Sequence, residues 1–188
     1  MKRIEITARQ PWQRFFVITV LAFCLCSCQQ PAIRNHAVAP KLSDKQVAIL
    51  NNLRDEINLT YGYVDGWPRI DRGPCGRFAK LFYEGWNEKV NDKVCIAFIM
   101  TTNGICDHVL IKLPDGSYFD GGNGVISSAT LLRAFRNGDR IEDMETFDYS
   151  LLDERSYSLK RSYELCPNYS DEITTRIIEK HLRLLPRD

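Results

Sequence analysis

The sequence lacks a charge imbalance and has few histidines. Its 188 residues include 25 Lys and Arg against 24 Asp and Glu, a formal net charge of +1. Such a balance gives no electrostatic footprint for nucleic acid, and that class of partner is excluded. The three histidines are His36, His108 and His181, so any acid–base chemistry that uses an imidazole has few candidates.

The chain also lacks an apolar run long enough to span a bilayer. The longest run, residues 15–26, has about a dozen residues, whereas a transmembrane helix needs roughly 20. The small residue Ser27 follows this run, and four basic residues precede it: Lys2, Arg3, Arg9 and Arg14. This three-part layout is typical of an export signal, so residues 1–27 are predicted to be a signal peptide that is removed.

The residues that end this segment, Leu25-Cys26-Ser27-Cys28, resemble the lipobox of bacterial lipoproteins. The resemblance implies that Cys28 is linked to diacylglycerol and becomes the first residue of the mature chain. Gln29 rather than Asp follows the cysteine, which in the sorting pattern of these proteins implies the outer membrane of a Gram-negative cell, facing the periplasm. The alternative is an ordinary secretory signal with a cysteine at this position by chance.

The remaining chain has the size of one domain. Removal of residues 1–27 leaves 161 residues with 21 Lys and Arg and 23 Asp and Glu, enough for a single core. Residues 28–41 have no apolar periodicity and are predicted to be the lipidated N-terminus and a tether. Because neither repeats nor low-complexity segments follow, residues 42–188 are predicted to form a single domain.

Capping residues and apolar periodicity predict four helices, at residues 44–58, 74–86, 128–136 and 170–186. The first follows a capping box of Ser43 and Gln46, in which each side chain satisfies a free backbone donor of the other residue. Pro74 suits the first turn of the second helix because its missing N–H would be unpaired there anyway. Cys75 is therefore predicted to lie at the N-terminus of a buried helix.

Three strands are predicted between these helices, at residues 94–100, 107–113 and 117–120. Pro114-Asp115-Gly116 forms a turn between the second and third strands, and Gly121, Gly122 and Gly124 form a loop after the third. Residues 139–163 alternate poorly and are expected to hold one or two short strands whose positions the pattern does not give. The predicted fold class is α+β, with helices packed on a small antiparallel sheet.

Cys75 is a candidate nucleophile. A cysteine attacks as a thiolate, and a helix N-terminus favours that form because its unpaired N–H groups and its dipole attract negative charge. Gly73 and Pro74 precede the cysteine and Gly76 follows it, so little bulk would block an incoming carbonyl. Its own backbone N–H is a candidate oxyanion donor.

His108 and Asp120 are the candidate base and orienting carboxylate. If residues 114–116 form a three-residue hairpin loop with Gly116 left-handed, paired residue numbers sum to about 230. His108 and Asp120 then share one face as diagonal neighbours, within reach of a hydrogen bond. A two-residue turn would shift the register by one residue and send Asp120 to the opposite face.

The order Cys75, His108, Asp120 on a helix start, a strand and the adjacent strand resembles the papain-like and transglutaminase-like cysteine enzymes. The resemblance covers roughly residues 70–125 and implies a core of that type. It implies that the cysteine attacks a carbonyl, the histidine moves the proton and the carboxylate orients the imidazole. The leading hypothesis is therefore a lipid-anchored envelope hydrolase or acyltransferase that acts on an amide bond and needs no cofactor.

The sequence leaves alternatives for the oxyanion hole and for the role of the cysteines. The side chain that would complete the oxyanion hole has three upstream candidates: Asn58, Tyr61 and Tyr63. The domain has four cysteines: Cys75, Cys95, Cys106 and Cys166. This even number would suit two structural disulfides in an oxidising compartment. The competing hypothesis is accordingly a non-catalytic, disulfide-stabilised lipoprotein that serves as a binding or assembly module in the envelope.

Overall fold

The structure, a computed structural model, describes residues 41–104, 106–127, 140–144 and 165–186. All of them belong to one compact unit of the chain, His36–Asp188. Several predicted features lie outside the described residues: the signal segment with Cys28, the tether, the helix at 128–136 and most of 139–163. Within the described residues, no helix combines the length and the apolar character that a membrane crossing requires.

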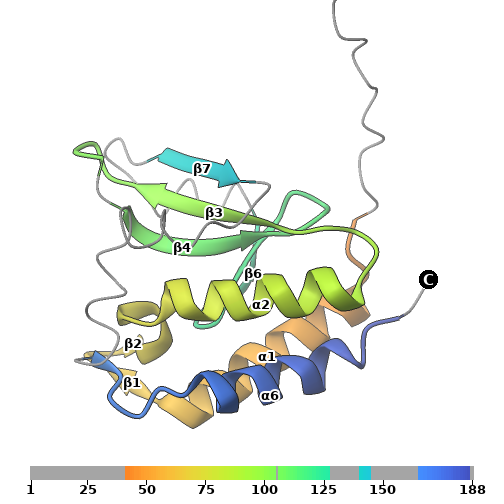
Figure 1. The fold of residues 1–188 in the computed structure, drawn as a ribbon, viewed down its shortest axis with the longest axis horizontal. Helices are drawn as coiled ribbons and strands as arrows, with labels where there is room; N and C mark the ends of the chain where they lie inside the picture. Colours follow the sequence, from red (N-terminus) through yellow and green to blue (C-terminus); the bar gives the residue numbers. More distant parts are fainter. Residues whose placement is uncertain (1–40, 105, 128–139, 145–164, 187–188) are drawn as a thin grey trace, which may run out of the picture. The chain divides into compact units, whose positions relative to one another are not determined.

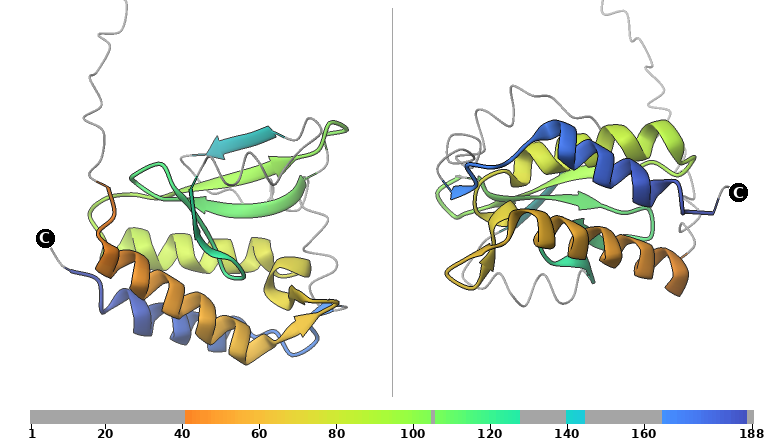
Figure 2. Two further views of the ribbon diagram at one scale, coloured as in Figure 1. Left: turned by 180° about the vertical axis from the view of Figure 1, so that it is seen from behind. Right: turned by 90° about the horizontal axis from the view of Figure 1, so that it is seen from below.

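Three helices cover one face of a five-stranded antiparallel sheet in the described part of the chain (Figures 1 and 2). The helices are α1 (Asp44–Tyr61), α2 (Cys75–Lys89) and α6 (Asp171–Leu182). The sheet has the order β6 (Gly124–Ile126), β5 (Tyr118–Asp120), β4 (Cys106–Lys112), β3 (Cys95–Met100) and β7 (Arg140–Met144). The predicted α+β class is thereby confirmed.

A small hairpin and a helical turn connect α1 to α2. The hairpin consists of β1 (Tyr63–Val64) and β2 (Trp67–Pro68), and the 3-10 helix η1 (Arg69–Arg72) follows it. The hairpin turn is made by Asp65 and Gly66, both with positive φ, a conformation common in two-residue turns between antiparallel strands. This connection carries the chain to the N-terminus of α2, where Cys75 lies.

The helix starts follow the predicted capping residues. Ser43 and Gln46 form the capping box of α1, and the Ser170 side chain accepts a hydrogen bond from the backbone N–H of Ile173 at the start of α6. The C-terminal ends of these helices differ from the predicted ends. Helix α1 continues to Tyr61 and ends at Gly62, whose φ of 76° breaks the helix, whereas α6 ends at Leu182, before the predicted limit.

The three predicted strands are β3, β4 and β5, but the glycine loop after them also contains a strand. Strand β6 pairs with β5, and the side chain of Asn51 on α1 accepts a hydrogen bond from the backbone N–H of Val125 at 3.1 Å. Gly121 and Gly122 do lie in a turn, as predicted, whereas Gly124 begins the strand, so the loop prediction holds for residues 121–123 only. Strand β7 pairs with β3 and lies within the segment whose strands the sequence pattern left unplaced.

Aromatic side chains join α2 to the sheet. Phe82 lies between Phe78 and Trp86 of its own helix and Phe119 of β5, with ring centroids 4.8 Å apart in the Phe82–Phe119 pair. Both members of that pair are fully buried. Four other buried residues form a second, smaller hydrophobic cluster: Ala97, Ile99, Leu110 and Tyr118. Strand β3 is thus buried along nearly its whole length, as predicted for an interior strand.

Replacement of Phe82 by alanine tests the role of this aromatic cluster. We expect the free energy of unfolding to fall by about 3–5 kcal/mol, because the variant loses apolar burial and leaves a cavity between α2 and β5. Urea denaturation followed by circular dichroism measures the change. Leu59→Ala on α1, where the leucine is 86% exposed, is the control and should change stability by less than about 0.5 kcal/mol. Equal effects of the two substitutions would contradict the assignment of Phe82 to the core.

Candidate functional site

The β4–β5 hairpin has the register predicted from its turn. Ile111 lies opposite Phe119 and Lys112 opposite Tyr118, so paired numbers sum to 230. Gly116 has a φ of 82°, the left-handed conformation that the three-residue loop requires. Because this register places alternate residues on one face, the hairpin brings together two residues that are twelve positions apart, His108 and Asp120.

The two side chains are hydrogen-bonded. His108 Nε2 lies 3.2 Å from Asp120 Oδ2, and both residues are buried. The other carboxylate oxygen, Oδ1, accepts hydrogen bonds from the backbone N–H groups of Gly122, at 3.0 Å, and of Asn123. Backbone donors therefore hold the carboxylate in place, and the carboxylate in turn orients the imidazole with Nε2 as the donor.

Cys75 is the first residue of α2, and its side chain forms a hydrogen bond with His108. The imidazole thus has both a carboxylate, at Nε2, and a thiol as hydrogen-bond partners. The structure brings all three predicted site residues together, and it buries the cysteine, which is 2% exposed.

The surroundings of His108 and Asp120 favour a charged imidazole and a charged carboxylate. Burial lowers the pKa of His108, but hydrogen bonds to Asp120 and Cys75 and the nearby negative charges outweigh it and raise that pKa well above its usual value. Burial raises the pKa of Asp120, yet the hydrogen bond and charge of His108 outweigh this effect, so the pKa of Asp120 is lowered. Perturbed groups of this kind are concentrated at functional sites.

Two further polar residues belong to the site, and sequence reasoning missed both. The Asn123 side-chain amide donates to Asp71 Oδ2 at 2.9 Å and to Asp120 Oδ2 at 3.0 Å, so it bridges the two carboxylates. Asp71 lies on η1, four positions before Cys75. Taken alone, an aspartate and an asparagine beside glycines are ordinary turn residues, so no local signal marks them.

Asp71 approaches the site closely because Gly122 has no side chain. A Cβ at position 122 would lie 1.9 Å from Asp71 Oδ2, a distance that no side chain tolerates. Burial, followed by the charge of Asp120, raises the pKa of Asp71 to about 7, although His108 acts in the opposite direction. A side chain at position 122 would thus displace the Asp71 carboxylate from its place beside Asn123.

The three upstream oxyanion candidates are not equally placed. Asn58 is buried, but its side-chain amide donates to the carbonyl of Gly122 at 2.9 Å. The Tyr61 hydroxyl contacts the Ser170 carbonyl and the Thr174 hydroxyl on the α6 side. Tyr63 lies on β1 and is 56% exposed. The Tyr61 hydroxyl thus contacts α6, the Asn58 amide uses one of its two N–H groups on Gly122, and the backbone N–H of Cys75 is the candidate donor at the cysteine itself.

The cysteines do not form the disulfides that the competing hypothesis requires. Cys75, Cys106 and Cys166 are buried free thiols, so the four cysteines of the domain are not linked to one another. Cys106 donates to the carbonyl of His108 at 3.4 Å, and burial, together with the charge of Cys75, raises its pKa to about 12. A thiol with this pKa stays protonated at neutral pH, so Cys106 is a poor nucleophile.

One group of residues in the described part of the chain has the donor set of a metal site. Single ligand atoms of Asp71, His108 and Asp120 lie within 4.8 Å of one another. Imidazole and carboxylate ligands suit zinc, which such sites bind with an open fourth position. In this structure, however, the histidine nitrogen and a carboxylate oxygen bind each other, and Asn123 binds both carboxylates. The arrangement is therefore that of a hydrogen-bonded network.

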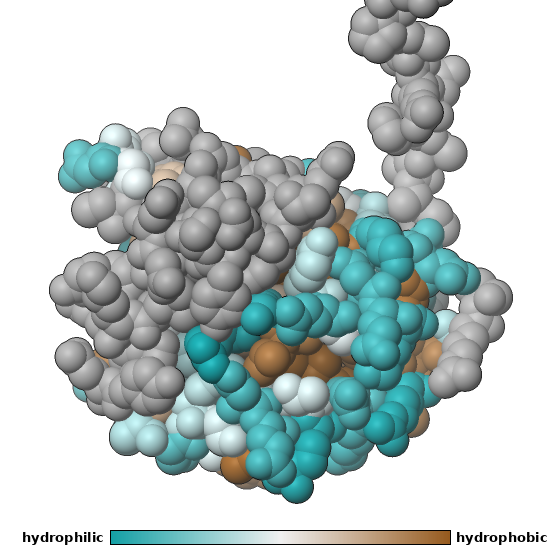
Figure 3. Space-filling model, in the orientation of Figure 1, coloured by the Kyte–Doolittle hydropathy of each residue, from teal (hydrophilic) through white to brown (hydrophobic). Residues whose placement is uncertain are grey.

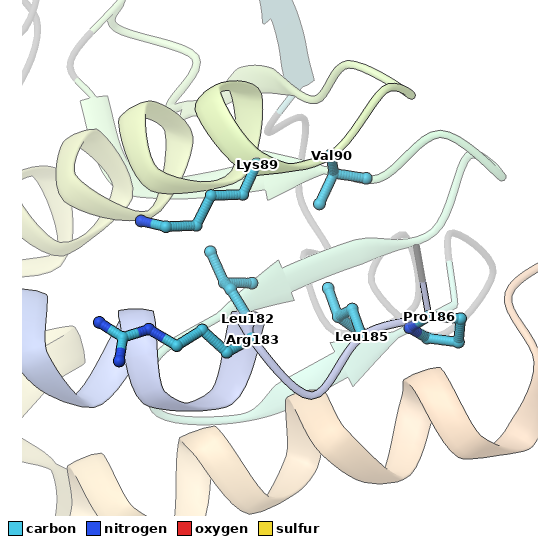
Figure 4. A pocket seen from close by; sticks show the side chains of 6 residues that line it. All are labelled: Lys89, Val90, Leu182, Arg183, Leu185 and Pro186. Carbon is cyan, nitrogen blue, oxygen red and sulfur yellow. The ribbon is translucent and has the colours of Figure 1, made fainter. Parts of the chain in front are cut away.

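A surface pocket lies away from this network, near the ends of α2 and α6 (Figure 4). Two cationic side chains, Lys89 and Arg183, line the pocket. The rest of its lining is apolar: Val90, Leu182, Leu185 and Pro186. Both cations pair with Glu179, at 3.3 Å and 3.1 Å. The surface view from the same side as Figure 1 shows a hydrophobic area bordered by hydrophilic side chains (Figure 3). None of the three predicted site residues lines this pocket.

No protein-family model, no curated protein and no solved structure matches the chain. The geometry of the site is therefore what indicates a function.

Replacement of Asp120 by asparagine tests the buried pair through the pH dependence of stability. The pKa of His108 is higher in the folded chain than its value of about 6.5 in the unfolded chain, so its charged form stabilises the fold fully below that pH. The pKa of Asp120 is lower in the folded chain than its value of about 3.9 in the unfolded chain, so its charged form stabilises the fold fully above that pH. We expect the variant to be less stable by about 1–3 kcal/mol between these pH values. The deficit should shrink as pH falls through the pKa of Asp120 or rises through that of His108.

Urea denaturation at a series of pH values measures this deficit. Asp171→Asn is the control, because it removes a carboxylate from the partly exposed ion pair with Arg77 on α2. Surface pairs contribute about 0–1 kcal/mol, so the control should show a small change. A deficit for Asp120→Asn that is constant from pH 3 to pH 9 would refute the ionic character of the pair.

Proposed function

We propose that this chain is a lipid-anchored cysteine hydrolase or acyltransferase that acts on an amide bond in the cell envelope. One observation supports the proposal above all: the His108 imidazole is hydrogen-bonded both to the thiol of Cys75 and to the carboxylate of Asp120. This is the arrangement by which cysteine enzymes activate a nucleophile. The position of Cys75 at the first residue of α2 adds the favourable field of a helix N-terminus.

In the proposed reaction, the Cys75 thiolate attacks the carbonyl carbon, and the electron pair of the C=O bond moves to oxygen. The backbone N–H of Cys75 donates to that oxyanion. Protonated His108 then gives its proton to the amide nitrogen, the C–N bond breaks, an amine leaves and a thioester remains. Neutral His108 removes a proton from water or from a second amine, which attacks the thioester and releases the cysteine. Asp120 holds the imidazole in the required tautomer throughout.

The papain-like or transglutaminase-like core belongs to the same proposal. The features that support it are the helix start that carries Cys75 and the adjacent antiparallel strands that carry His108 and Asp120. The export signal and the lipobox-like residues before Cys28 support a location at the outer membrane, facing the periplasm. A peptide crosslink of the cell wall or an envelope protein would be reachable from such an anchor.

The pH profile of Cys75 alkylation tests the proposed nucleophile. The full-length chain, purified in detergent, is treated with iodoacetamide between pH 5 and pH 9, and the modified cysteines are identified by peptide mass spectrometry. We expect Cys75 to react faster than the other buried cysteines at neutral pH, because the neighbouring imidazole can take up the proton of its thiol. Cys106 and Cys166 are internal controls, since burial raises the pKa of both thiols.

His108→Gln should slow the alkylation of Cys75, because glutamine cannot take up the thiol proton. His181→Gln is a matched control, because His181 is also buried and also binds a carboxylate, that of Glu56 at 2.7 Å. Cys75→Ala should in turn lower the release of new amino groups from isolated envelopes by at least about 10³-fold. Identical alkylation of wild-type protein and His108→Gln, or no reaction of Cys75 until the protein unfolds, would reject the enzyme in favour of a binding module.

The lipid anchor has a separate test. Cells that express the chain are grown with a radiolabelled fatty acid, and the protein is immunoprecipitated. We expect wild-type protein to carry the label and Cys28→Ser to carry none, because serine cannot form the thioether to diacylglycerol. Cys26→Ser is the control and should keep the label. Labelled Cys28→Ser protein would show that the attachment site is elsewhere.

A further inference from the structure

We propose that Asp71 is a positioning residue of the Cys75–His108–Asp120 site, a second carboxylate whose charge determines how firmly His108 holds its proton. This inference rests on the proposed function. Asp71 and Asp120 share one donor, the Asn123 side-chain amide, which lies 2.9 Å and 3.0 Å from their Oδ2 atoms. Ligand atoms of both carboxylates and of the imidazole lie within 4.8 Å of one another.

The structure holds Asp71 in this position from several sides. Gly122 leaves the space that the carboxylate occupies, and its backbone N–H also binds Asp71. The neighbouring Ile70 is 1% exposed, so η1 is packed into the core beside the site. The Oδ1 atom of Asp71 is buried and has no hydrogen-bond partner within the protein. A surface aspartate would avoid such an environment, because a buried unpartnered carboxylate oxygen is costly.

The charges that face Asp71 come from several elements. Asp120 on β5 repels it, and His108 on β4 attracts it when protonated. The Cys75 thiol on α2 is hydrogen-bonded to the His108 side chain, and the Cys106 thiol on β4 donates to the backbone carbonyl of His108. Two arginines lie nearby but contact other groups: Arg54 on α1 binds Asp55 and the carbonyl of Asn123, and Arg72 stacks on Trp67.

These contacts make the charge of Asp71 sensitive to pH near neutrality, since burial and Asp120 raise its pKa to about 7. Above that pH, two carboxylates face one imidazolium. The second negative charge makes loss of the His108 proton less favourable, so the imidazole stays protonated to higher pH. Asp71 thereby extends the alkaline limit of the proposed reaction without touching a substrate.

The test is the titration of His108 in Asp71→Asn, followed by NMR of the full-length chain in detergent with ¹³Cε1-labelled histidine. The chain has three histidines, and His108→Gln and His181→Gln assign their signals. Asparagine keeps an acceptor for Asn123 but removes the charge. We expect the His108 midpoint to fall by about one pH unit relative to wild type. Asp55→Asn, which removes an exposed charge beside Arg54, should leave the midpoint unchanged.

A His108 midpoint that stays within about 0.3 unit of wild type in Asp71→Asn would overturn the inference, since a facing charge shifts a pKa by more than that. Asp71→Ser, a smaller uncharged variant, gives the same readout if the asparagine variant fails to fold. The two proposals fail separately. An unreactive wild-type Cys75 rejects the enzyme whatever the titration shows, whereas a reactive Cys75 with an unmoved His108 midpoint rejects only the role of Asp71.

Discussion

The turn at residues 114–116 is the constraint on which the site depends. The Asp115 carboxylate accepts hydrogen bonds from the backbone N–H and the hydroxyl of Ser117, at 3.0 Å and 2.6 Å, and Gly116 supplies the left-handed backbone. Because side chains alternate along a strand, a hairpin one residue shorter would turn Asp120 away from His108. The other Asp115 oxygen accepts from the backbone N–H of Leu42, which ties the same turn to the start of α1.

The site concentrates charge where burial makes charge costly. Asp120 accepts hydrogen bonds from His108, from the backbone of Gly122 and from both the backbone and the side chain of Asn123. These donors offset the loss of solvent, and the pKa of Asp120 is lowered in spite of burial. Asp71 has fewer donors, so burial dominates and its pKa is raised. Two neighbouring carboxylates are thus given different charges by their surroundings, a pattern typical of acid–base sites.

The position of the nucleophile depends on the hydrophobic core. Helix α2 carries Cys75 at its first residue, and the Phe82–Phe119 contact packs the same helix against β5, whose last residue is Asp120. On its other side, α2 packs against α6 at Gly85, where a Cβ would lie 3.5 Å from Ile178 and Leu182. Changes in this packing would therefore move the thiol relative to the hairpin, and core and site are coupled.

By itself the sequence determined the local features. The Ser43 and Ser170 caps, the interior strand β3 and the hairpin register follow from capping geometry, apolar pattern and turn chemistry, each of which acts over a few residues. From these features the grouping of Cys75, His108 and Asp120 was predictable.

Only the tertiary structure decided the rest. Strand β6 pairs with its neighbour β5, and its Val125 is also held from a distance, because the Asn51 side chain on α1 accepts a hydrogen bond from its backbone N–H. Asp71 joins the site because Gly122 leaves space for its carboxylate and Asn123 binds it. These contacts link residues about fifty or more positions apart, and no local propensity encodes them. Burial, which shifts the pKa values of His108, Asp120 and Asp71, is likewise a property of the assembled core and not of the residues that it surrounds.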